Sequence, residues 1–386
     1  MNINDSEIQL DEPLAPKRTR LEEFWRLFRK NRLAIAGMVF FVIFCIIATV
    51  GFLLTIGKNP VIDPSIVRLQ DKLRPPLAKP NLEMLQRNEI PKLGVYIFGT
   101  DDLGRDVFAR MLQGSYVSLS IGFVAVGIAV IIGIFLGGIA GYYGHRHVRV
   151  GQLLTAVLLI AGALLLIGKL IWAGSALLIC GAGAILISIL IKRSVKSTAK
   201  PAWARLWLFN SISIDTLVMR FVDIMLCFPS FFLILTVVAL LPSSIFNIMI
   251  VIGLTSWMGA TRFVRAEFLS LREQDFVAAA RALGLSNFRI IFRHMMPNAV
   301  APVLVSATIG IASAILTEAG LSFLGFGVQP PDATWGNILS DGKNFIFDAP
   351  WLTFVPGIAI LIVVLSFNLF GEGLRDVLNP KLRERQ

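Results

Sequence analysis

The sequence predicts an all-α protein, a polytopic transmembrane helical bundle, from its composition and from the length of its apolar runs. Hydrophobic residues make up 55% of the 386 residues and charged residues only 16%, and the mean hydropathy of +0.73 exceeds that of a soluble domain. Several apolar runs reach about 20 residues without a charge, which is the length that a helix needs to cross a bilayer. The net charge of +11 is spread over tails and loops, so membrane topology explains it better than nucleic-acid binding does.

About eight apolar spans follow one another along the chain. We expect them at 33–56, 116–141, 152–168, 170–191, 222–241, 245–261, 299–323 and 351–370. These boundaries divide the chain into a polar tail, a first helix, a long loop, a core in two parts, an inserted hairpin, a loop within the core and a second tail. In that order, the parts are 1–32, 33–56, 57–115, 116–144 with 215–371, 145–214, 262–298 and 372–386.

The distribution of lysine and arginine predicts the orientation. Seven basic residues precede the first span, and the loop at 262–296 carries six arginines, whereas the segment at 324–350 holds only Lys343. Because short loops rich in positive charge stay on the cytoplasmic side, both termini and the 262–298 loop are expected in the cytoplasm. The first span has no small-residue cleavage site after it and is expected to remain as an anchor. The long, proline-rich loop that follows it is then external.

The third and fourth spans form a hairpin at 145–214. Basic residues flank it on both sides, from Arg146 and Arg149 to Lys192 and Arg193. The hairpin is therefore expected to begin and end on the cytoplasmic side, which leaves the orientation of every later span unchanged.

The loop between the sixth and seventh spans contains an amphipathic, arginine-bearing stretch, DFVAAARALGLSNFRIIFRHMMPN, from Asp275 to Asn298. Its first part is rich in helix formers. Gly284 then offers a C-cap, and Ser286 can cap a second helix that ends at Pro297. The pattern predicts two short helices joined at a glycine.

The two predicted helices are expected to present different surfaces. On the first, small side chains allow a partner backbone to approach closely: Ala278, Ala279, Ala280 and Ala282. On the second, apolar residues recur at helical spacing: Phe288, Ile291, Phe292 and Met295. Arg289 and Arg293 lie on another face, so one face is expected to dock and the other to contact charge. From the residues alone, an amphipathic loop lying on the inner lipid surface, held by anionic headgroups, explains the stretch equally well.

The spacing of Ala279, Ala280, Gly284 and Pro297 resembles the "EAA" signature of binding-protein-dependent ABC importer permeases, with Ala278 in place of the glutamate of the signature. In that family the loop docks in a cleft of the ATPase subunit. The resemblance implies an ATPase-coupling loop made by Asp275, Ala278, Ala279, Ala280, Gly284, Arg289, Arg293 and Pro297.

Five further stretches narrow the resemblance to the dipeptide, oligopeptide and nickel importer permeases, and within them to the second of two permease subunits. They are FGTDDLGRDVFARMLQGSYVSLSIG, GYYG, MRFVDIMLCFPSFF, WMGATRFVRAEFLSLREQDFV and EAGLSFLGFGVQPPDATWGNILSDG. The likeness covers about 98–144 and 215–380. It implies a six-helix ABC importer permease core, so the hairpin at 145–214 is an insertion, which is expected to face lipid.

Several charged residues are candidates for function. Glu318 lies late in an apolar span, where an ionisable group is costly. A role at a gate or in helix contacts, and a capped structural carboxylate, are both open for it. Asp101, Asp102, Arg105 and Asp106 precede the second span. Acids in the first turn of a helix explain this group, and contact with an external binding protein is the alternative.

Other residues point to packing. Gly133, Gly137 and Gly141 are four residues apart in the second span and predict a groove for close helix packing. Arg220 and Asp223, three residues apart, are expected to form a local pair.

The resemblance implies a subunit that forms the translocation pathway of an ATP-driven importer for peptides or a related solute such as nickel. This subunit is not expected to be an enzyme or to bind a cofactor, because ATP and magnesium belong to separate ATPase subunits in this family. The implied partners are a second homologous permease subunit, two ATPase subunits, an external solute-binding protein and membrane lipid, with no nucleic acid. The implied location is the cell inner membrane.

Two other classes of protein compete with this interpretation. A secondary transporter or channel not driven by ATP needs ionisable groups near the middle of the membrane, where Glu318 is one of few. A membrane-embedded hydrolase needs a nucleophile with a base, or a metal cluster. The three histidines, His145 and His147 at the hairpin entrance and the distant His294, make no ligand set. No catalytic residue and no metal site are expected.

Overall fold

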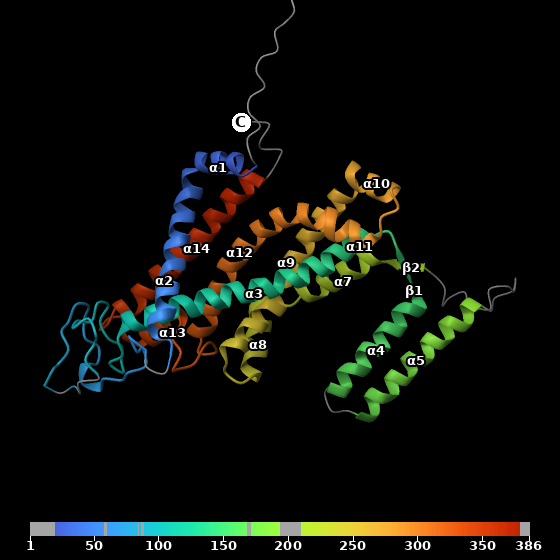
Figure 1. Ribbon diagram of the computed structural model, residues 1–386. Coiled ribbons are helices and arrows are strands. Elements are labelled where there is room, and N and C mark those ends of the chain that lie inside the picture. Colours follow the sequence, from blue (N-terminus) through green and yellow to red (C-terminus); the bar gives the residue numbers. More distant parts are fainter. Residues whose placement is uncertain are drawn as a thin grey trace, which may run out of the picture.

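The computed structural model describes residues 20–57, 60–83, 85, 89–167, 171–193 and 210–378. Within these ranges the prediction of an all-α bundle is confirmed: helices make up nearly all regular structure, beside one two-stranded sheet (Figure 1). Most of the two predicted tails, and the tip of the hairpin at 168–170, lie outside the described residues.

The elements fall into a bundle, an inserted hairpin and a short helical stretch within the bundle. The bundle contains α1 (Arg20–Lys30), α2 (Arg32–Thr55), the 3-10 turn η1 (Leu69–Asp71), α3 (Val107–Tyr143), α7 (Ile214–Leu226), α8 (Ser230–Leu240), α9 (Ile245–Arg272), α12 (Met296–Phe323), α13 (Trp335–Gly342), the 3-10 turn η3 (Lys343–Phe345) and α14 (Trp351–Leu378). The hairpin contains β1 (His147–Arg149), α4 (Val150–Ile167), α5 (Ile171–Arg193) and β2 (Asn210–Ser213). The stretch between α9 and α12 contains α10 (Asp275–Ala282), α11 (Asn287–Arg289) and the π-helix η2 (Ile290–Met295).

Five helices of the described chain are long and apolar enough to cross a membrane: α2, α3, α9, α12 from Pro302, and α14. The span predicted at 222–241 is not one straight helix, because the chain bends by 75° between α7 and α8. Pro229 occupies the bend, where it has no N–H to donate to the preceding turn and stands at the N-cap of α8. Counted together, α7 and α8 make a sixth, broken span.

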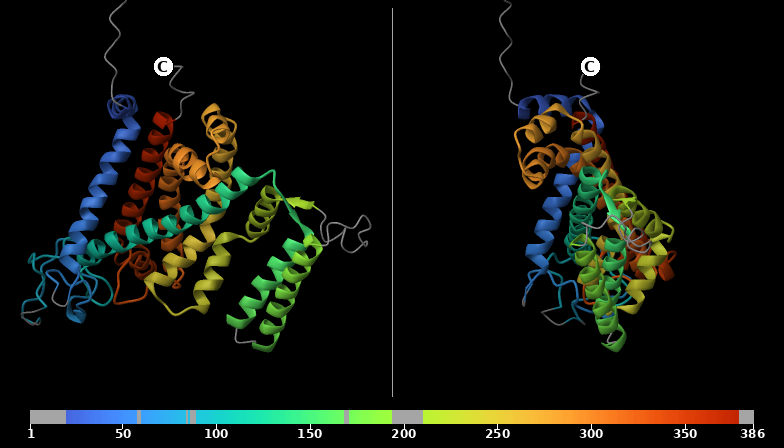
Figure 2. Two further views of the ribbon diagram at one scale, coloured as in Figure 1. Left: turned by 45° about the vertical axis from the view of Figure 1, so that its right-hand side comes forward. Right: turned by 90° about the vertical axis from the view of Figure 1, so that its right-hand side faces the viewer.

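Helix α3 begins at Val107, ahead of the span predicted at 116–141, so the loop predicted at 57–115 ends at Asp106. The Asp106 side chain accepts a hydrogen bond from the Phe108 N–H (2.9 Å) and caps this earlier helix end. With 37 residues, α3 runs from that loop to the hairpin (Figure 2).

The hairpin lies to one side of the bundle (Figures 1 and 2). Helices α4 and α5 pack mainly on each other, and β1 pairs antiparallel with β2 at their base, with His147 opposite Ser213. Helix α4 has 18 residues and α5 has 23, and both are strongly apolar. The hairpin predicted at 145–214 therefore forms as two apolar helices closed by a β-ribbon.

The most extensive helix contact joins α3 and α9. Gly133, Gly137 and Gly141 form the close-packing face that their spacing predicts, and α9 is the helix packed against it. A Cβ on Gly133 would lie 2.6 Å from the Ala260 Cβ, and one on Gly141 would lie 2.5 Å from the Phe268 Cβ. Without side chains at these positions, the two helix backbones can touch. Branched and aromatic side chains from α3, α8, α9, α12 and α14 form the main buried core beside this contact.

The close contact predicts that one added methyl group has opposite effects at two glycines of α3. A Cβ at Gly137 would lie 2.5 Å from the Thr261 carbonyl oxygen and 2.9 Å from the Val264 Cβ, whereas nothing lies within 4 Å of one at Gly127. We expect Gly137→Ala to lower the stability of the purified protein by about 1–3 kcal/mol through overpacking. Gly127→Ala should be neutral or stabilising, because alanine has the higher helix propensity. Thermal unfolding in detergent measures both, and equal melting temperatures would contradict the packing described.

Candidate functional site

The arginine-bearing stretch at 275–297 is held between α9 and α12. Helix α9 continues unbroken to Arg272, so the loop predicted to begin at 262 begins only at Glu273. The extension is helical because its apolar residues, among them Val264 and Phe268, are buried against the end of α3. The stretch is therefore attached directly to a long helix of the bundle.

Gly284 ends α10, as its sequence position predicts. Its φ of +71° lies in the left-handed region that glycine adopts without strain. Its N–H donates to the Arg281 carbonyl oxygen (2.9 Å), and the Leu285 N–H donates to the Ala280 carbonyl oxygen (3.2 Å). This pair of bonds is a Schellman motif, which satisfies the last carbonyls of the helix and turns the chain sharply into α11.

The second predicted helix does not end at Pro297. Ser286 stands at the N-cap, where its carbonyl oxygen accepts from the Ile290 N–H (3.0 Å), but its hydroxyl makes no capping bond. From there the chain passes through η2 directly into α12, and Pro297 lies in the first turn of that helix. Proline is tolerated there because the N–H groups of a first turn have no partner within the helix.

The inner face of the stretch packs on the bundle. Val277, Ala280, Ile290 and Met295 are buried in one cluster with Phe268 of α9. The prediction that the alanines present small side chains to a partner is therefore wrong for Ala280, because its side chain packs into this buried cluster. The stretch is a packed part of the bundle and is not a free loop.

Tyr142 of α3 packs against the same inner face and bonds to the stretch. The Tyr142 hydroxyl donates to the Asn287 side-chain oxygen (2.7 Å), and the Arg281 guanidinium lies 5.5 Å from the centroid of the Tyr142 ring. A guanidinium over an aromatic face is attracted to the ring. These contacts join the stretch to the ends of both α3 and α9.

The outer face of the stretch carries aromatic and basic side chains together. Its exposed members are Asp275, Ala278, Ala279, Arg281, Ala282, Leu283, Gly284, Ser286, Phe288, Arg289, Phe292, Arg293 and Pro297. The rings of Phe288 and Phe292 lie 4.5 Å apart, and the two residues are 71% and 53% exposed. The predicted division into an apolar face and a charged face is wrong, because Ile290 and Met295 take the buried positions and the two phenylalanines lie beside the arginines. This outer face combines rings and cations suited to a macromolecular contact.

The charged residues before α3 form a buried network. Asp101 is fully buried, and its Oδ2 pairs with Arg105 (2.7 Å) and Arg110 (2.6 Å). Both arginines also reach Asp341, at 3.1 and 2.8 Å, and Arg110 donates to Asn337 (3.4 Å). The network therefore ties the start of α3 to α13 and to the loop before it. Sequence spacing could not reveal it, because Asn337 and Asp341 are far away in the chain.

Burial decides between the two interpretations of the predicted external group. Asp101, Arg105 and Asp106 are buried, which leaves them no surface for an external partner, so the proposed contact through these three is wrong. Asp102 is half-buried and lies outside the ion pairs, and its burial raises the pKa of its carboxyl group.

A second buried carboxylate organises the loop between α2 and α3. Asp71 accepts hydrogen bonds from the Tyr96 hydroxyl (2.7 Å) and the Asn81 N–H (3.2 Å), and it pairs with Arg74 (3.3 Å). Burial, followed by the bond to Asp71, raises the pKa of Tyr96. The tyrosine therefore stays a neutral donor, and the proline-rich loop has a fixed fold that no local pattern predicts.

Glu318 is fully buried in α12. Its Oε1 accepts a hydrogen bond from the Ser322 hydroxyl (2.7 Å), and its Oε2 lies 3.5 Å from the Ser118 hydroxyl of α3. Ser118 in turn accepts from the Trp335 N–H at the start of α13 (3.4 Å). Of the two interpretations left open, this geometry is that of a capped carboxylate that joins three helices.

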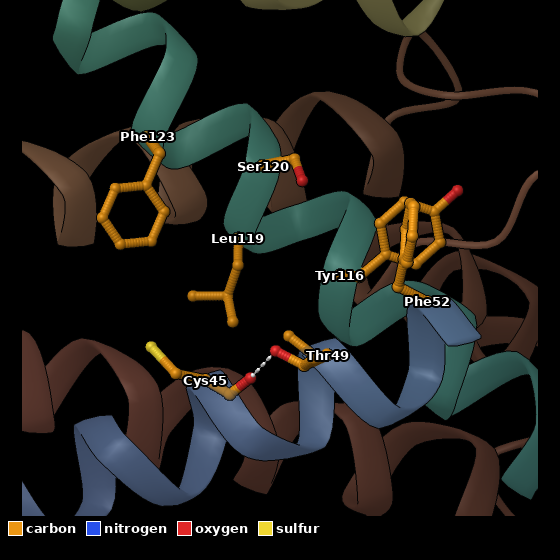
Figure 3. A pocket seen from close by; sticks show the side chains of 8 residues that line it. Cys45, Thr49, Phe52, Tyr116, Leu119, Ser120 and Phe123 are labelled. Atoms are coloured by element: carbon orange, nitrogen blue, oxygen red, sulfur yellow. Dashed lines mark hydrogen bonds between the residues drawn. The ribbon is translucent and has the colours of Figure 1, made fainter. Parts of the chain in front are cut away.

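An open groove of about 310 Å³ lies between α2 and α3 (Figure 3). Cys45, Ala48, Thr49 and Phe52 of α2 and Tyr116, Leu119, Ser120 and Phe123 of α3 line it. The Thr49 hydroxyl donates to the Cys45 carbonyl oxygen (2.7 Å) and is thereby satisfied within its own helix. None of the lining residues carries a formal charge. The described residues also hold no group of three side chains suited to a metal.

Comparison with known proteins places this architecture among transport components. A family described as "Binding-protein-dependent transport system inner membrane component" matches residues 202–384, and "N-terminal TM domain of oligopeptide transport permease C" matches 19–76. The "Dipeptide transport system permease protein DppC" of Alkalihalophilus pseudofirmus is 36% identical over 361 residues, covering 94% of this chain and 90% of that protein. DppC of Haemophilus influenzae is 32% identical, covering 97% and 99%, and the "Oligopeptide transport system permease protein OppC" of Bacillus subtilis is 29% identical, covering 92% and 88%.

The buried network predicts that two neighbouring aspartates differ sharply in importance. Asp101→Asn removes the fully buried one of the two carboxylates that Arg105 and Arg110 share and leaves them only the partly exposed Asp341. We expect it to destabilise the protein by about 3 kcal/mol, the lower end of the cost of breaking a buried ion pair. Asp102→Asn is the matched control and should change stability little. Thermal unfolding and the rate of trypsin cleavage in the α2–α3 loop measure the difference, and similar behaviour of the two variants would show that the network does not hold the loop.

Proposed function

Because the chain belongs to the family of binding-protein-dependent transport system inner membrane components, we propose that it forms one half of the translocation pathway of an ATP-driven peptide importer. It is a multi-pass membrane protein and a transport permease. The names of its relatives support peptides as the solute, since those relatives are dipeptide and oligopeptide permeases. Nickel, the other solute implied by the sequence resemblance, has no such support among them.

The outer face of the 275–297 stretch is the observation that carries the proposal. Phe288 and Phe292 expose most of their surface beside Arg289 and Arg293. Large aromatic and arginine side chains are the residues that most often anchor protein interfaces, and rings left in water forgo their burial energy. We therefore assign this face to an ATPase subunit, with the face and both termini on the cytoplasmic side. The inner membrane is the proposed location.

The mechanism follows from how the stretch is attached. Two ATPase subunits, which would hold ATP and magnesium, come together on binding ATP and move the stretch. Phe268 of α9 and Tyr142 of α3 contact the inner face of the stretch. The movement therefore passes into α3 and α9, the two most closely packed helices of the bundle. A second homologous permease subunit completes the pathway, and a solute-loaded external binding protein delivers the peptide. Alternating access of this pathway then imports the solute.

The buried state of Glu318 argues against the rival, a secondary transporter or channel not driven by ATP. A carboxylate that couples an ion must be reachable from a water-filled path. Glu318 is instead fully buried and bonded to serines on two helices. This environment supports a structural role for Glu318. A structural Glu318 does not couple an ion, which favours an energy source outside this chain.

The proposal predicts that a bulky side chain at Gly284 separates the permease from its ATPase subunits. Gly284→Trp places an indole on the outer face, and we expect ATPase binding to weaken about tenfold or more, as for a central interface residue. Gly94→Trp is the matched control: Gly94 also has a left-handed φ, +68°, with nothing within 4 Å of an added Cβ, but lies in the α2–α3 loop. Both variants carry the same backbone cost.

Three measurements test this prediction: co-purification of the ATPase subunits, ATP hydrolysis by the assembled complex, and peptide uptake by cells. Co-purification of the second permease subunit controls for folding. Normal ATPase binding, hydrolysis and uptake in Gly284→Trp would contradict the assignment and return the stretch to the inner lipid surface.

A further inference from the structure

Two arginines of α9 pair with two aspartates of α7, near the end of α9 that carries the outer face. Arg265 contacts Asp215 with both Nε and its Nη2, the latter at 2.5 Å from Oδ2. Arg262 pairs with Asp223 at 2.6 Å. The two arginines are three residues apart on one helix and the aspartates eight apart on the other, so each pair of like residues shares a helix face. The result is a double ion-pair contact, here called the α7–α9 clamp.

The local pair expected from the sequence is present beside the clamp. Arg220 also approaches Asp223, but at 3.7 Å and with a side chain that is 75% exposed. Of the two contacts that Asp223 makes, the one with Arg262 of α9 is the shorter. The bidentate Arg265–Asp215 contact is the more geometrically defined of the pairs, since two parallel N–H···O bonds fix orientation as well as distance.

Helix α7 packs on both α3 and α9. The 75° bend at its end separates it from α8, so α8 cannot direct it as a continuous helix would. Toward the bend, Phe221 stacks on Trp257 of α9, with ring centroids 5.5 Å apart, and Val222 is buried beside Trp257. These apolar contacts and the Asp223–Arg262 pair hold the later part of α7, and the Asp215–Arg265 pair holds the turn at which α7 begins.

The clamp lies between two other features on the same helices. On α9, Arg265 is three residues from Phe268, which packs under the 275–297 stretch, and Arg272 donates to the Gly141 carbonyl oxygen of α3 (3.0 Å). On α7, the Ile214 N–H donates to the Arg146 carbonyl oxygen (2.9 Å), which joins the helix to the base of the hairpin. Asp215 therefore lies where the inserted hairpin, the broken span and α9 meet.

We propose that Asp215 and Arg265, assisted by Asp223 and Arg262, are positioning residues that make α7 and the hairpin base move with the ATPase-docking stretch. This inference rests on the proposed function and adds a specific route: ATPase movement enters α9, crosses the clamp and reaches the broken span. Partly exposed ion pairs contribute little to folding stability. The clamp therefore sets the relative orientation of two helices that remain folded without it.

The test uses the complete reconstituted transporter with its external binding protein. Basal ATP hydrolysis is compared with hydrolysis stimulated by the solute-loaded binding protein, together with uptake. We expect Asp215→Asn to reduce the stimulation about fivefold, the lower end of ordinary coupling between sites, with assembly and melting temperature near those of the unmodified protein. Arg220→Gln, at the exposed and longer contact, is the matched control and should keep full stimulation.

Two further variants separate orientation from charge. Arg265→Lys keeps the charge but cannot form the bidentate contact with Asp215. We therefore expect this variant to lose part of the stimulation of ATP hydrolysis. The exchange of both charges, Asp215→Arg with Arg265→Asp, should restore at least half of it. Recovery by the exchange is a result that a merely damaged helix would not give.

Each remaining outcome decides against the clamp. Full stimulation in Asp215→Asn would overturn the proposal, as would failure of the double exchange to recover any stimulation. Loss of assembly in both Asp215→Asn and Asp223→Asn would make the contacts structural and would overturn it as well. If Gly284→Trp uncouples hydrolysis while Asp215→Asn does not, only this inference fails; if Gly284→Trp has no effect on ATPase binding, the proposed function fails first.

Discussion

The backbone contact between α3 and α9 at Gly133, Gly137 and Gly141 constrains the rest of the structure. A side chain at any of these positions would meet the neighbouring helix at or within van der Waals distance, so the two helices can pack only at this separation and in this register. That register places Tyr142 and Phe268 beneath the 275–297 stretch. It also sets where Arg262 and Arg265 emerge toward α7.

Both ends of α3 are fixed by polar contacts that its apolar middle could not provide. At its start, Asp101 and Asp341 neutralise two buried arginines and join α3 to α13. Near its other end, Tyr142 donates a hydrogen bond to Asn287 of the 275–297 stretch. Hydrophobic burial in lipid is weakly directional because lipid tails are as apolar as the helices. Ion pairs and hydrogen bonds at the helix ends therefore give the bundle its specific arrangement.

The sequence predicts well what depends on local pattern. The apolar runs locate the membrane helices, Gly284 marks the end of α10, and the glycines four apart mark a packing face. It fails where distant residues decide: no spacing joins Asp101 to Asp341, and the buried places of Ala280 and Met295 depend on Phe268. The bend at Pro229 could have been predicted, since a proline inside an apolar run interrupts a helix. The length of the apolar run predicts a span but does not show where within it the helix bends.

The inserted hairpin shows how an addition can preserve a fold and still bear on its mechanics. Because His147 pairs with Ser213, the chain leaves and re-enters the bundle at almost the same point, so the order and packing of the core helices are undisturbed. The returning strand, however, leads directly into α7, where Ser213 caps the helix by accepting from the Thr216 N–H (3.0 Å). The next turn carries Asp215, which is bonded to α9. A hairpin attached through a flexible linker would be mechanically neutral, but one attached through a capped helix start and an ion pair shares the motion of the helix it joins.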